Sequence, residues 1–233
     1  MNYIIFNGKD SRDIKSLIIS ELPPITKAPV KNELIEIDGV DGDIVIKKGY
    51  KSYVRSMFIG LRRNYNIDEV INYFNQTGWI TFSNEPDKKY YVDVLDQIDF
   101  ERLLRFRTAT VNFYAKPYKY LINEAKATKT YTETDPKEII VTNKGFENSK
   151  PTIYIKGSGK IEVSINGSSC FKYDFDTDTE VYINSEEENA YLKNDLKNRN
   201  MIGKFPQLVS GKNKITWTGD IKKIEVDIKS RWL

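Results

Sequence analysis

The sequence contains no histidine and only one cysteine, Cys170. Without histidine, neither a Ser-His-Asp triad nor a Cys-His pair can form, and no metal site can use an imidazole ligand. A single cysteine cannot close an intrachain disulfide or supply the thiolate cluster that zinc prefers. We therefore expect a fold stabilised by packing, with no cofactor, no metal, no catalytic residues and no enzymatic activity.

The sequence also has no large excess of charge of one sign. Its 36 Lys and Arg residues and 33 Asp and Glu residues give a net charge of +3. This balance disfavours duplex nucleic acid as the main partner. No apolar run approaches the about 18 residues of a transmembrane helix, and residues 1–11 lack the regions of a signal peptide. We expect a soluble protein made in a reducing compartment, without membrane insertion.

The chain has 233 residues, which suits one large or two small domains with enough core to fold unaided. Most of it consists of short apolar or alternating segments bounded by turn residues, the pattern of β-strands. In the first half these segments are residues 3–6, 16–22, 34–37, 44–46, 53–61, 79–82 and 90–95. In the second half they are residues 138–142, 152–156, 161–165, 171–175, 180–184, 214–217 and 221–228.

One helix is predicted, over residues 67–76. Asn66 can cap its first turn, and the apolar residues 67, 70, 71 and 74 fall on one face. Gly78 is placed to adopt the left-handed conformation after the last turn. From Arg102 to Tyr114, polar and apolar residues occur on both alternating faces, so neither face is purely polar. We therefore predict a strand with both faces partly covered.

A polar, aperiodic stretch near residues 122–136 indicates a domain boundary. Beyond it, Asn166-Gly167 is a strong hairpin signal between two alternating strands. Gly157-Ser158-Gly159-Lys160 is expected to form another tight hairpin and not a phosphate-binding loop. Evenly spaced strands with turns between them predict a two-sheet sandwich.

The second half of the sequence contains few candidate residues for metal binding, sugar binding or catalysis. Asp174, Asp176 and Asp178 have the spacing that opens a calcium loop, but Thr179 and Ser185 stand where that loop needs Gly and Glu, so we expect a solvated turn. Cys170 is expected to fill the core. Trp217 and nearby tyrosines are either sandwich core or a sugar-stacking platform. Paired carboxylates of a glycan-cleaving enzyme remain a weaker alternative.

A series of motifs runs along nearly the whole chain. The first half contains Phe6-Asn7-Gly8 with Asp10-Ser11, Glu21-Leu22-Pro23, residues 37–42, residues 79–82, Asp87, Tyr90-Tyr91 and residues 113–118. The second half contains residues 143–145, Pro151, residues 157–159, residues 165–167, residues 205–208, residues 211–215, residues 217–219 and residues 231–233. In the order and spacing of these motifs the chain resembles the siphophage distal tail protein (Dit) family, in its short form with a galectin-like C-terminal domain.

This resemblance implies a mainly β fold in three parts. Residues 1–122 would be an N-terminal β-sandwich or split-barrel domain with one short helix, which forms the ring of the hub. Residues 123–135 would be a linker, and residues 136–233 a C-terminal galectin-like β-sandwich. The motif positions expected to maintain the fold or form interfaces are Phe6, Gly8, Gly39, Asp41, Gly42, Trp79, Phe82, Tyr90, Tyr91, Pro117, Tyr118, Gly167, Trp217, Gly219 and Trp232.

The resemblance also implies a structural virion protein, made in the bacterial host cytoplasm and placed at the distal end of a long non-contractile phage tail. The expected partners are further copies in a homohexamer or in stacked rings, the tail tube protein, the tail-associated lysin or fibre base, the tape measure protein, and peripheral baseplate or receptor-binding proteins. DNA would only pass through the lumen, which should lack clustered Lys and Arg. A carbohydrate-binding module that attaches to the host surface is the alternative.

Overall fold

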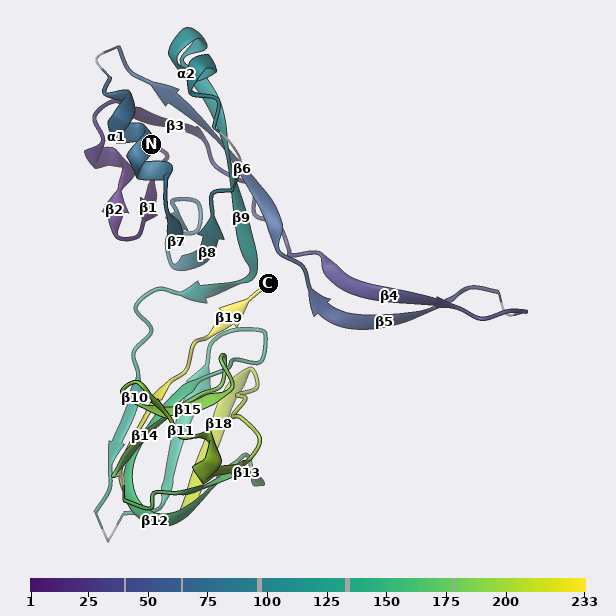
Figure 1. Cartoon of the computed structure of the whole chain (residues 1–233), viewed down its shortest axis with the longest axis vertical. Coiled ribbons are helices and arrows are strands. Elements are labelled where there is room, and N and C mark those ends of the chain that lie inside the picture. The colour runs from purple at the N-terminus through teal and green to yellow at the C-terminus, as the bar shows by residue number, and fades with distance from the viewer. Residues whose placement is uncertain (40, 64, 96–97, 133–134, 178) are drawn as a thin grey trace. The chain divides into compact units, whose positions relative to one another are not determined.

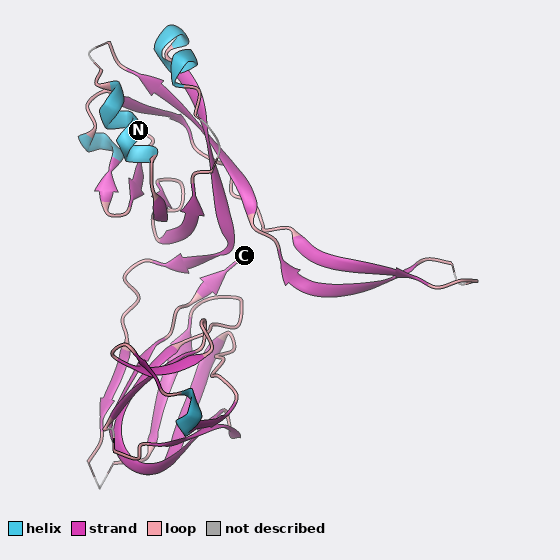
Figure 2. Cartoon of the chain, viewed as in Figure 1, coloured by secondary structure: helices cyan, strands magenta, loops and turns pink. Residues whose placement is uncertain are grey.

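The computed structural model describes residues 1–39, 41–63, 65–95, 98–132, 135–177 and 179–233 (Figure 1). The motif residue Val40, residues 133–134 of the predicted linker and Asp178 lie outside these ranges. The chain divides into two compact units, Met1–Ile122 together with Leu233, and Asn123–Trp232. Strands predominate in both units, which confirms the mainly β prediction (Figure 2).

The first unit is built on one antiparallel sheet with the strand order β2-β1-β7-β8-β9-β6-β3, and strands β4 and β5 form a separate two-stranded sheet. Its elements are β1 (Ile4–Phe6), β2 (Lys9–Asp10), η1 (Ser11–Asp13), β3 (Leu17–Glu21), β4 (Val30–Glu36), β5 (Asp43–Tyr50), β6 (Tyr53–Leu61), α1 (Ile67–Phe74), β7 (Thr77–Phe82), β8 (Lys88–Asp93), α2 (Phe100–Phe106) and β9 (Thr108–Leu121).

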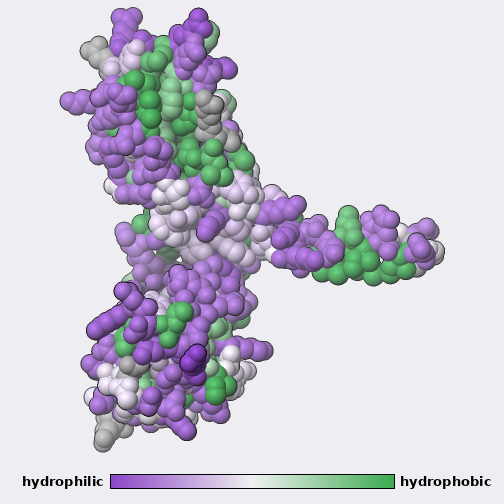
Figure 3. All heavy atoms as spheres, viewed as in Figure 1, coloured by the Kyte–Doolittle hydropathy of each residue, from purple (hydrophilic) through white to green (hydrophobic). Residues whose placement is uncertain are grey.

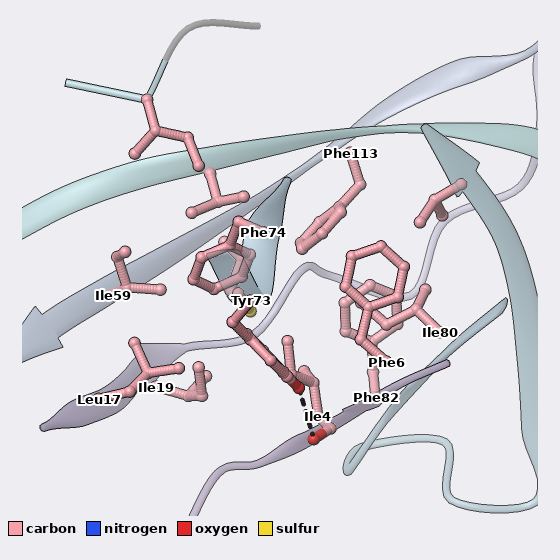
Figure 4. Packing of buried hydrophobic residues seen from close by; sticks show 14 of the residues in the cluster. Ile4, Phe6, Leu17, Ile19, Ile59, Tyr73, Phe74, Ile80, Phe82 and Phe113 are labelled. Atoms are coloured by element: carbon pink, nitrogen blue, oxygen red, sulfur yellow. Dashed lines mark hydrogen bonds between the residues drawn. The ribbon is translucent and has the colours of Figure 1, made fainter. Parts of the chain in front are cut away.

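Helix α1 contributes Tyr73 and Phe74 to the apolar core of this unit, where their rings lie close to those of Phe6, Phe82 and Phe113 (Figure 4). The Phe113 ring meets the rings of Phe6 and Phe82 edge-on, with centroids 6.0 and 5.7 Å apart. The Tyr73 hydroxyl donates a hydrogen bond to the Ile4 carbonyl at 3.4 Å. The predicted helix is confirmed with its Asn66 cap, which accepts a bond from the Glu69 amide.

The expected strand over residues 102–114 is wrong in its first part, and the expectation of one helix in this domain is wrong as well. Residues 100–106 form a second helix, α2, which buries Leu103. The Asp99 carboxylate accepts a bond from the Arg102 amide at 2.7 Å and so caps the helix. Arg107 adopts a left-handed conformation with φ of 61°, which ends the helix before β9 begins.

Gly78 does not have the role predicted for it. Helix α1 ends at Phe74, and Gly78 lies inside strand β7 with φ of +150°. A Cβ atom at residue 78 would lie 2.0 Å from the Oδ1 atom of Asn7. That oxygen accepts a hydrogen bond from the Trp79 amide at 2.9 Å. Glycine is therefore required because the Asn7 side chain approaches the backbone closely.

The second unit is a curled antiparallel sheet that closes into a sandwich, with the strand order β10-β18-β12-β14-β15-β16; β11 also pairs with β18, β13 with β12, and β17 with β13. Its elements are β10 (Ala127–Thr130), β11 (Glu138–Asn143), β12 (Thr152–Ile165), β13 (Ser168–Asp174), β14 (Glu180–Asn184), β15 (Asn189–Leu192), β16 (Asp195–Leu196), η2 (Asn198–Asn200), β17 (Met201–Gly203), β18 (Gly211–Asp227) and β19 (Arg231–Trp232).

The two strands predicted at residues 152–156 and 161–165 are one long strand, β12, so the tight hairpin expected at residues 157–160 is absent. Instead, the pairing of β12 with β18 shifts register between Ser158 and Glu162. The shift brings Gly219 of β18 so close that a Cβ atom there would lie 2.4 Å from the Lys160 carbonyl oxygen. This irregularity lets both strands bend across the sandwich.

Part of the predicted linker is ordered structure. Within residues 123–135, strand β10 pairs with β18, with Ala127 opposite Val226 and Thr128 opposite Glu225. Ala127 packs against the core of the second unit. Polar composition concealed this strand, because only every second side chain of an edge strand faces the core.

Candidate assembly surfaces

Strands β4 and β5 form a long hairpin, here called the arm (residues 30–50). Except at its base, every described residue of the two strands from Lys31 to Gly49 is exposed, on both faces of the ribbon. Gly39 and Gly42 have positive φ angles that shape its tip. At the base, the Tyr50 ring meets the Tyr118 ring edge-on with centroids 6.0 Å apart.

The two faces of the arm differ in polarity. Residues directly opposite each other in an antiparallel pair share a face. Ile35 lies opposite Ile44, and Ile46 lies two residues further along the same face. These three residues, here called the isoleucine face, are 39%, 51% and 41% exposed. Figure 3 shows the apolar band that they and their neighbours form on the arm.

The other face of the arm carries one apolar pair between polar ones. Leu34 lies opposite Val45. Pairs of charged or amide residues flank it, with Asn32 opposite Lys47 and Glu36 opposite Asp43. A two-stranded ribbon is marginally stable alone in water, and exposed apolar residues add to that cost. The arm therefore has the character of a segment that another surface covers.

A second exposed apolar surface lies on the first unit, on the sheet face opposite the core, and is here called the outer face. Its large residues are Val54 and Phe58 of β6, Tyr114 of β9 and Trp79 of β7, all more than one third exposed. Val54 and Tyr114 are directly paired. Such a cluster is the kind of surface that proteins use for association.

Lysine side chains cover the aromatic end of the outer face. The Lys89 ammonium lies 4.8 Å from the centre of the Trp79 ring, and the Lys116 ammonium lies 4.7 Å from that of Tyr91. Trp79 meets the rings of Tyr91 and Tyr120 edge-on, each at 5.4 Å. This end of the outer face combines aromatic area with positive charge, which suits a partner that carries carboxylates.

A buried ionic cluster holds the loop before β8 against the sheet. Arg55 is only 2% exposed, and its guanidinium lies 4.2 Å from the centre of the Tyr90 ring. Glu85 accepts hydrogen bonds from Lys119 at 2.5 Å and from the Tyr90 hydroxyl, and lies 4.0 Å from Arg55. Burial, together with the bond to Glu85, raises the pKa of Tyr90. Hydrogen bonds, an ion pair and ring contacts join these groups to one another, so the cluster is structural.

The motif residues named from the sequence occupy three kinds of position. The buried ones are Phe6, Phe82, Tyr90 and Trp217. The turn or bulge glycines with positive φ are Gly8, Gly39, Gly42, Gly167 and Gly219. Those with exposed or half-buried side chains are Asp41 at the arm tip, Trp79 and Tyr91 on the outer face, Pro117 and Tyr118 on β9, and Trp232 on β19. They do not converge on one site, and interface roles for the exposed ones stay predictions.

Trp217 cannot serve as a sugar-stacking platform. It is 4% exposed, lies in the core of the second unit, and has the Tyr131 ring edge-on at 6.1 Å. Cys170 is also placed differently from the prediction, because it is half-buried rather than a core residue, and burial raises the pKa of its thiol. The thiol is therefore held in its neutral form.

Within the described ranges, no three His, Cys, Asp or Glu side chains gather closely enough to hold a metal ion. None of the helices in the same ranges has the length and apolar character needed to cross a membrane. The sequence predicts strands at residues 34–37 and 44–46 but not the long exposed arm that they belong to. One sequence signal for the arm is that residues 44–46 are all apolar, whereas a half-buried strand would alternate apolar and polar residues.

Comparison with known proteins gives two findings. Residues 7–115 match the family model of the phage tail protein RIFT-related domain. Over its whole length the chain is similar in structure to the SPP1 Dit (gp 19.1) protein, described as a paradigm of the hub adsorption apparatus in phages that infect Gram-positive bacteria. The TM-score is 0.73 at 17% sequence identity, and both chains are covered completely. No curated protein matches the sequence.

Proposed function

We propose that this chain, a relative of the siphophage distal tail proteins by its N-terminal domain and its fold, is a structural hub protein of a phage tail tip. In this proposal the first unit assembles into a homohexameric ring at the distal end of the tail. The observation that carries the proposal is the arm, an exposed apolar hairpin on a phage tail domain. A protein with such an arm is built for assembly rather than for catalysis.

The contact that we propose joins the isoleucine face of one copy to the outer face of the next. The charged side chains among residues 36–46 are all carboxylates: Asp38 and Asp41 lie beside the turn at the tip, and Glu36 and Asp43 lie on the face opposite the isoleucines. The outer face carries Lys89 and Lys116 over its aromatic rings. Apolar surface therefore meets apolar surface, and negative charge meets positive charge.

A contact between two different surfaces of the same protein is heterologous, and repeated contacts of this kind close into a ring when the rotation between copies fits. This geometry supports a ring rather than a two-fold dimer. The number six comes from the distal tail resemblance. Stacking of two rings remains a further part of the same proposal.

The second unit, which we propose projects outward, would hold peripheral baseplate or receptor-binding proteins. The ring itself would join the tail tube protein to the tail-associated lysin or fibre base, with the tape measure protein and DNA passing through the lumen. The protein would then be made in the host cytoplasm and reside in the virion. The phage tail domain over residues 7–115 supports this placement.

Passing DNA restricts what the lumen can carry, because clustered cations would retain phosphate groups. Arg62, Arg63 and Arg105 are exposed at one end of the first unit. We propose that these arginines face away from the lumen in the ring. A ring reconstruction in which they line the channel would contradict this part of the proposal.

The test is the native mass of the full-length protein, measured by light scattering on a sizing column across a range of concentrations, with electron microscopy of the peak. We expect a mass of six subunits and ring-shaped particles. The fragment 1–122 should assemble in the same way. If the full-length chain and the fragment are both strictly monomeric at micromolar concentration, and remain so with tail tube protein added, the ring is wrong.

A further inference from the structure

The end of the first unit that carries helix α2 gathers five arginines that the proposed hub contact does not use. They come from residues 62–63, which follow β6, and from residues 99–107, which contain α2; both segments lie at the same end of the unit (Figure 1). No lysine occurs in either segment. These arginines and two aromatic residues near them are all exposed and are here called the arginine tip: Arg62, Arg63, Tyr65, Arg102, Arg105, Phe106 and Arg107.

The backbone holds the two segments of the arginine tip together. The Leu61 amide donates a hydrogen bond to the Arg107 carbonyl at 3.2 Å, and the Arg62 amide donates one to the Ser16 carbonyl at 2.9 Å. The Arg107 guanidinium lies 4.6 Å from the centre of the Tyr65 ring. The tip is therefore ordered before a partner arrives, which lowers the entropy cost of binding.

Most of the positive charge of the arginine tip has no partner within the chain. Its five arginines stand beside two carboxylates, Asp99 and Glu101, which leaves a net charge of +3. The Asp99 carboxylate caps α2, and Glu101 lies 3.5 Å from Arg105. Three guanidinium groups make no hydrogen bond or ion pair with another described residue, and these belong to Arg62, Arg63 and Arg102.

The surface beside α2 is hollowed and contains an exposed aromatic ring. The hollow has a volume of about 500 Å³ and is lined by Asp99, Glu101, Arg102, Arg105 and Phe106. Phe106 is 69% exposed. Arginine and aromatic side chains that lie together on an exposed surface are the residues that contribute most to binding energy at protein interfaces.

The mixture of charges selects the class of partner. Guanidinium groups bind carboxylates and phosphates through paired hydrogen bonds. A nucleic acid presents a continuous row of phosphates, which Asp99 and Glu101 in the same hollow would repel. A protein can present carboxylates to the arginines, hydrogen-bond donors to the two acidic residues and apolar side chains to Phe106. We propose that the arginine tip docks onto a different, acidic protein whose Asp and Glu residues surround an apolar pocket for Phe106.

This docking surface goes beyond the proposed hub function and does not depend on ring formation. In the proposed ring the same arginines face away from the lumen, where a second protein can reach them. The arm tip of another copy is the competing occupant, because it carries Asp38 and Asp41. The native mass of arginine variants separates these two occupants.

The experiment selects binders from a library of random short peptides with the full-length protein. The triple variant Arg62→Gln/Arg63→Gln/Arg102→Gln serves for counter-selection, so that only peptides that need the arginine tip are kept. We expect these peptides to share Asp and Glu residues around a Leu, Phe or Trp. Fluorescence anisotropy should give dissociation constants of roughly 0.1 mM, the range of a few exposed ion pairs and one buried ring. Binding should weaken between about 0.05 and 0.5 M salt.

Single variants then identify the contacts. Arg63→Gln and Arg102→Gln should each weaken binding of a selected peptide about fivefold, the effect of one exposed ion pair. Phe106→Ala should weaken it about tenfold, as expected for an aromatic anchor. Glu101→Gln removes a repelling charge and should strengthen binding. Arg199→Gln removes an exposed arginine of the second unit and should leave the affinity unchanged. All of these variants change exposed side chains, so the Tm should stay the same.

Three outcomes would overturn the proposal. The first is that no selected peptide depends on the arginine tip, or that the dependent peptides lack Asp and Glu. The second is that a short DNA duplex binds with the same dependence on Arg63 and Arg102 and more tightly than any peptide, which would show a nucleic-acid surface. The third is that the triple variant has a lower native mass than the original protein, which would show a contact between copies. An unchanged native mass together with acidic peptides supports docking, whether or not the original protein forms a ring.

Discussion

Ile35 and Ile44 lie directly opposite each other in the arm, and both side chains are exposed. Cross-strand isoleucine pairs are usually found where a sheet packs against a core. Here the two side chains remain 39% and 51% exposed, so much of their apolar area is available to a partner. The neighbouring cross-strand pair, Leu34 and Val45, lies on the opposite face of the arm and supplies an internal comparison.

Replacement of the isoleucine pair should weaken assembly. The double variant Ile35→Thr/Ile44→Thr keeps β-branched side chains, so the hairpin is retained while apolar area at the contact is lost. We expect the native mass to fall from the ring towards the monomer, at a concentration where the unmodified protein is assembled. Light scattering on a sizing column measures this change.

The matched control is Leu34→Thr/Val45→Thr, which makes the same kind of change on the other face of the arm. It should alter the native mass less than the isoleucine variant. Equal effects of the two variants would mean that both faces of the arm are covered, and no effect of either would exclude the arm from the ring contact.

Removal of Glu85 should destabilise the first unit strongly. In Glu85→Ala, Arg55 stays buried without its nearby carboxylate, and Lys119 loses its ion-pair partner. The loss of one member of a buried ion pair costs about 3–5 kcal/mol. Urea unfolding should show this decrease. Glu101→Ala breaks an exposed pair with Arg105 and should change the stability by less than about 0.5 kcal/mol.

Tyr154 should make stability depend on alkaline pH. Burial, with Glu180 nearby, raises the pKa of Tyr154 to about 12. The unfolded chain has an ordinary tyrosine pKa of about 10, so the folded state holds its proton more tightly. The contribution of Tyr154 is therefore fully present below about pH 10 and is lost as the pH rises through about 12. Urea midpoints across this range measure the decline.

The variant Tyr154→Phe should decline less over the same pH range, because it has no hydroxyl to ionise. Glu180→Gln removes the nearby negative charge and should lower the pKa of Tyr154, which the ultraviolet absorbance of tyrosinate reports. If the urea midpoints of the original protein and of Tyr154→Phe decline equally with pH, Tyr154 is not the group responsible for the decline.

Gly78→Ala should destabilise the first unit, because the new methyl group would collide with the Asn7 side chain. Overpacking of this kind costs typically about 1–3 kcal/mol. Thermal unfolding gives the decrease in Tm. Gly8→Ala provides a comparison, since Gly8 also has positive φ but has open space around its Cβ position. The decrease in Tm of Gly8→Ala therefore reflects backbone strain alone. A smaller loss for Gly78→Ala than for Gly8→Ala would contradict the collision.

Local patterns were enough to predict much of the fold. Asn66 and the apolar spacing after it identified α1, and Asn166-Gly167 identified the turn between β12 and β13. Helix α2 was missed because residues 102–114 alternate well enough to suggest one strand. The Asp99 side chain caps the helix and the left-handed backbone of Arg107 ends it, and the second of these is a backbone geometry that composition does not display.

The candidate surfaces were harder to predict, because exposure depends on tertiary structure. Trp79 and Trp217 sit in similar alternating strands, yet one is exposed on the outer face and the other is buried. Residues 157–160 contain two glycines that suggest a turn, whereas they lie within β12, where its pairing with β18 shifts register.

The carboxylates at the arm tip have a consequence before any ring exists. A newly made arm exposes two strand edges and a row of isoleucines, the features that promote uncontrolled β-aggregation. Glu36, Asp38, Asp41 and Asp43 place four negative charges beside them, so two arms repel each other tip to tip. We therefore expect these residues to act as gatekeepers that keep newly made subunits dispersed, while in the proposed ring a neighbour bearing lysines can still accept the arm.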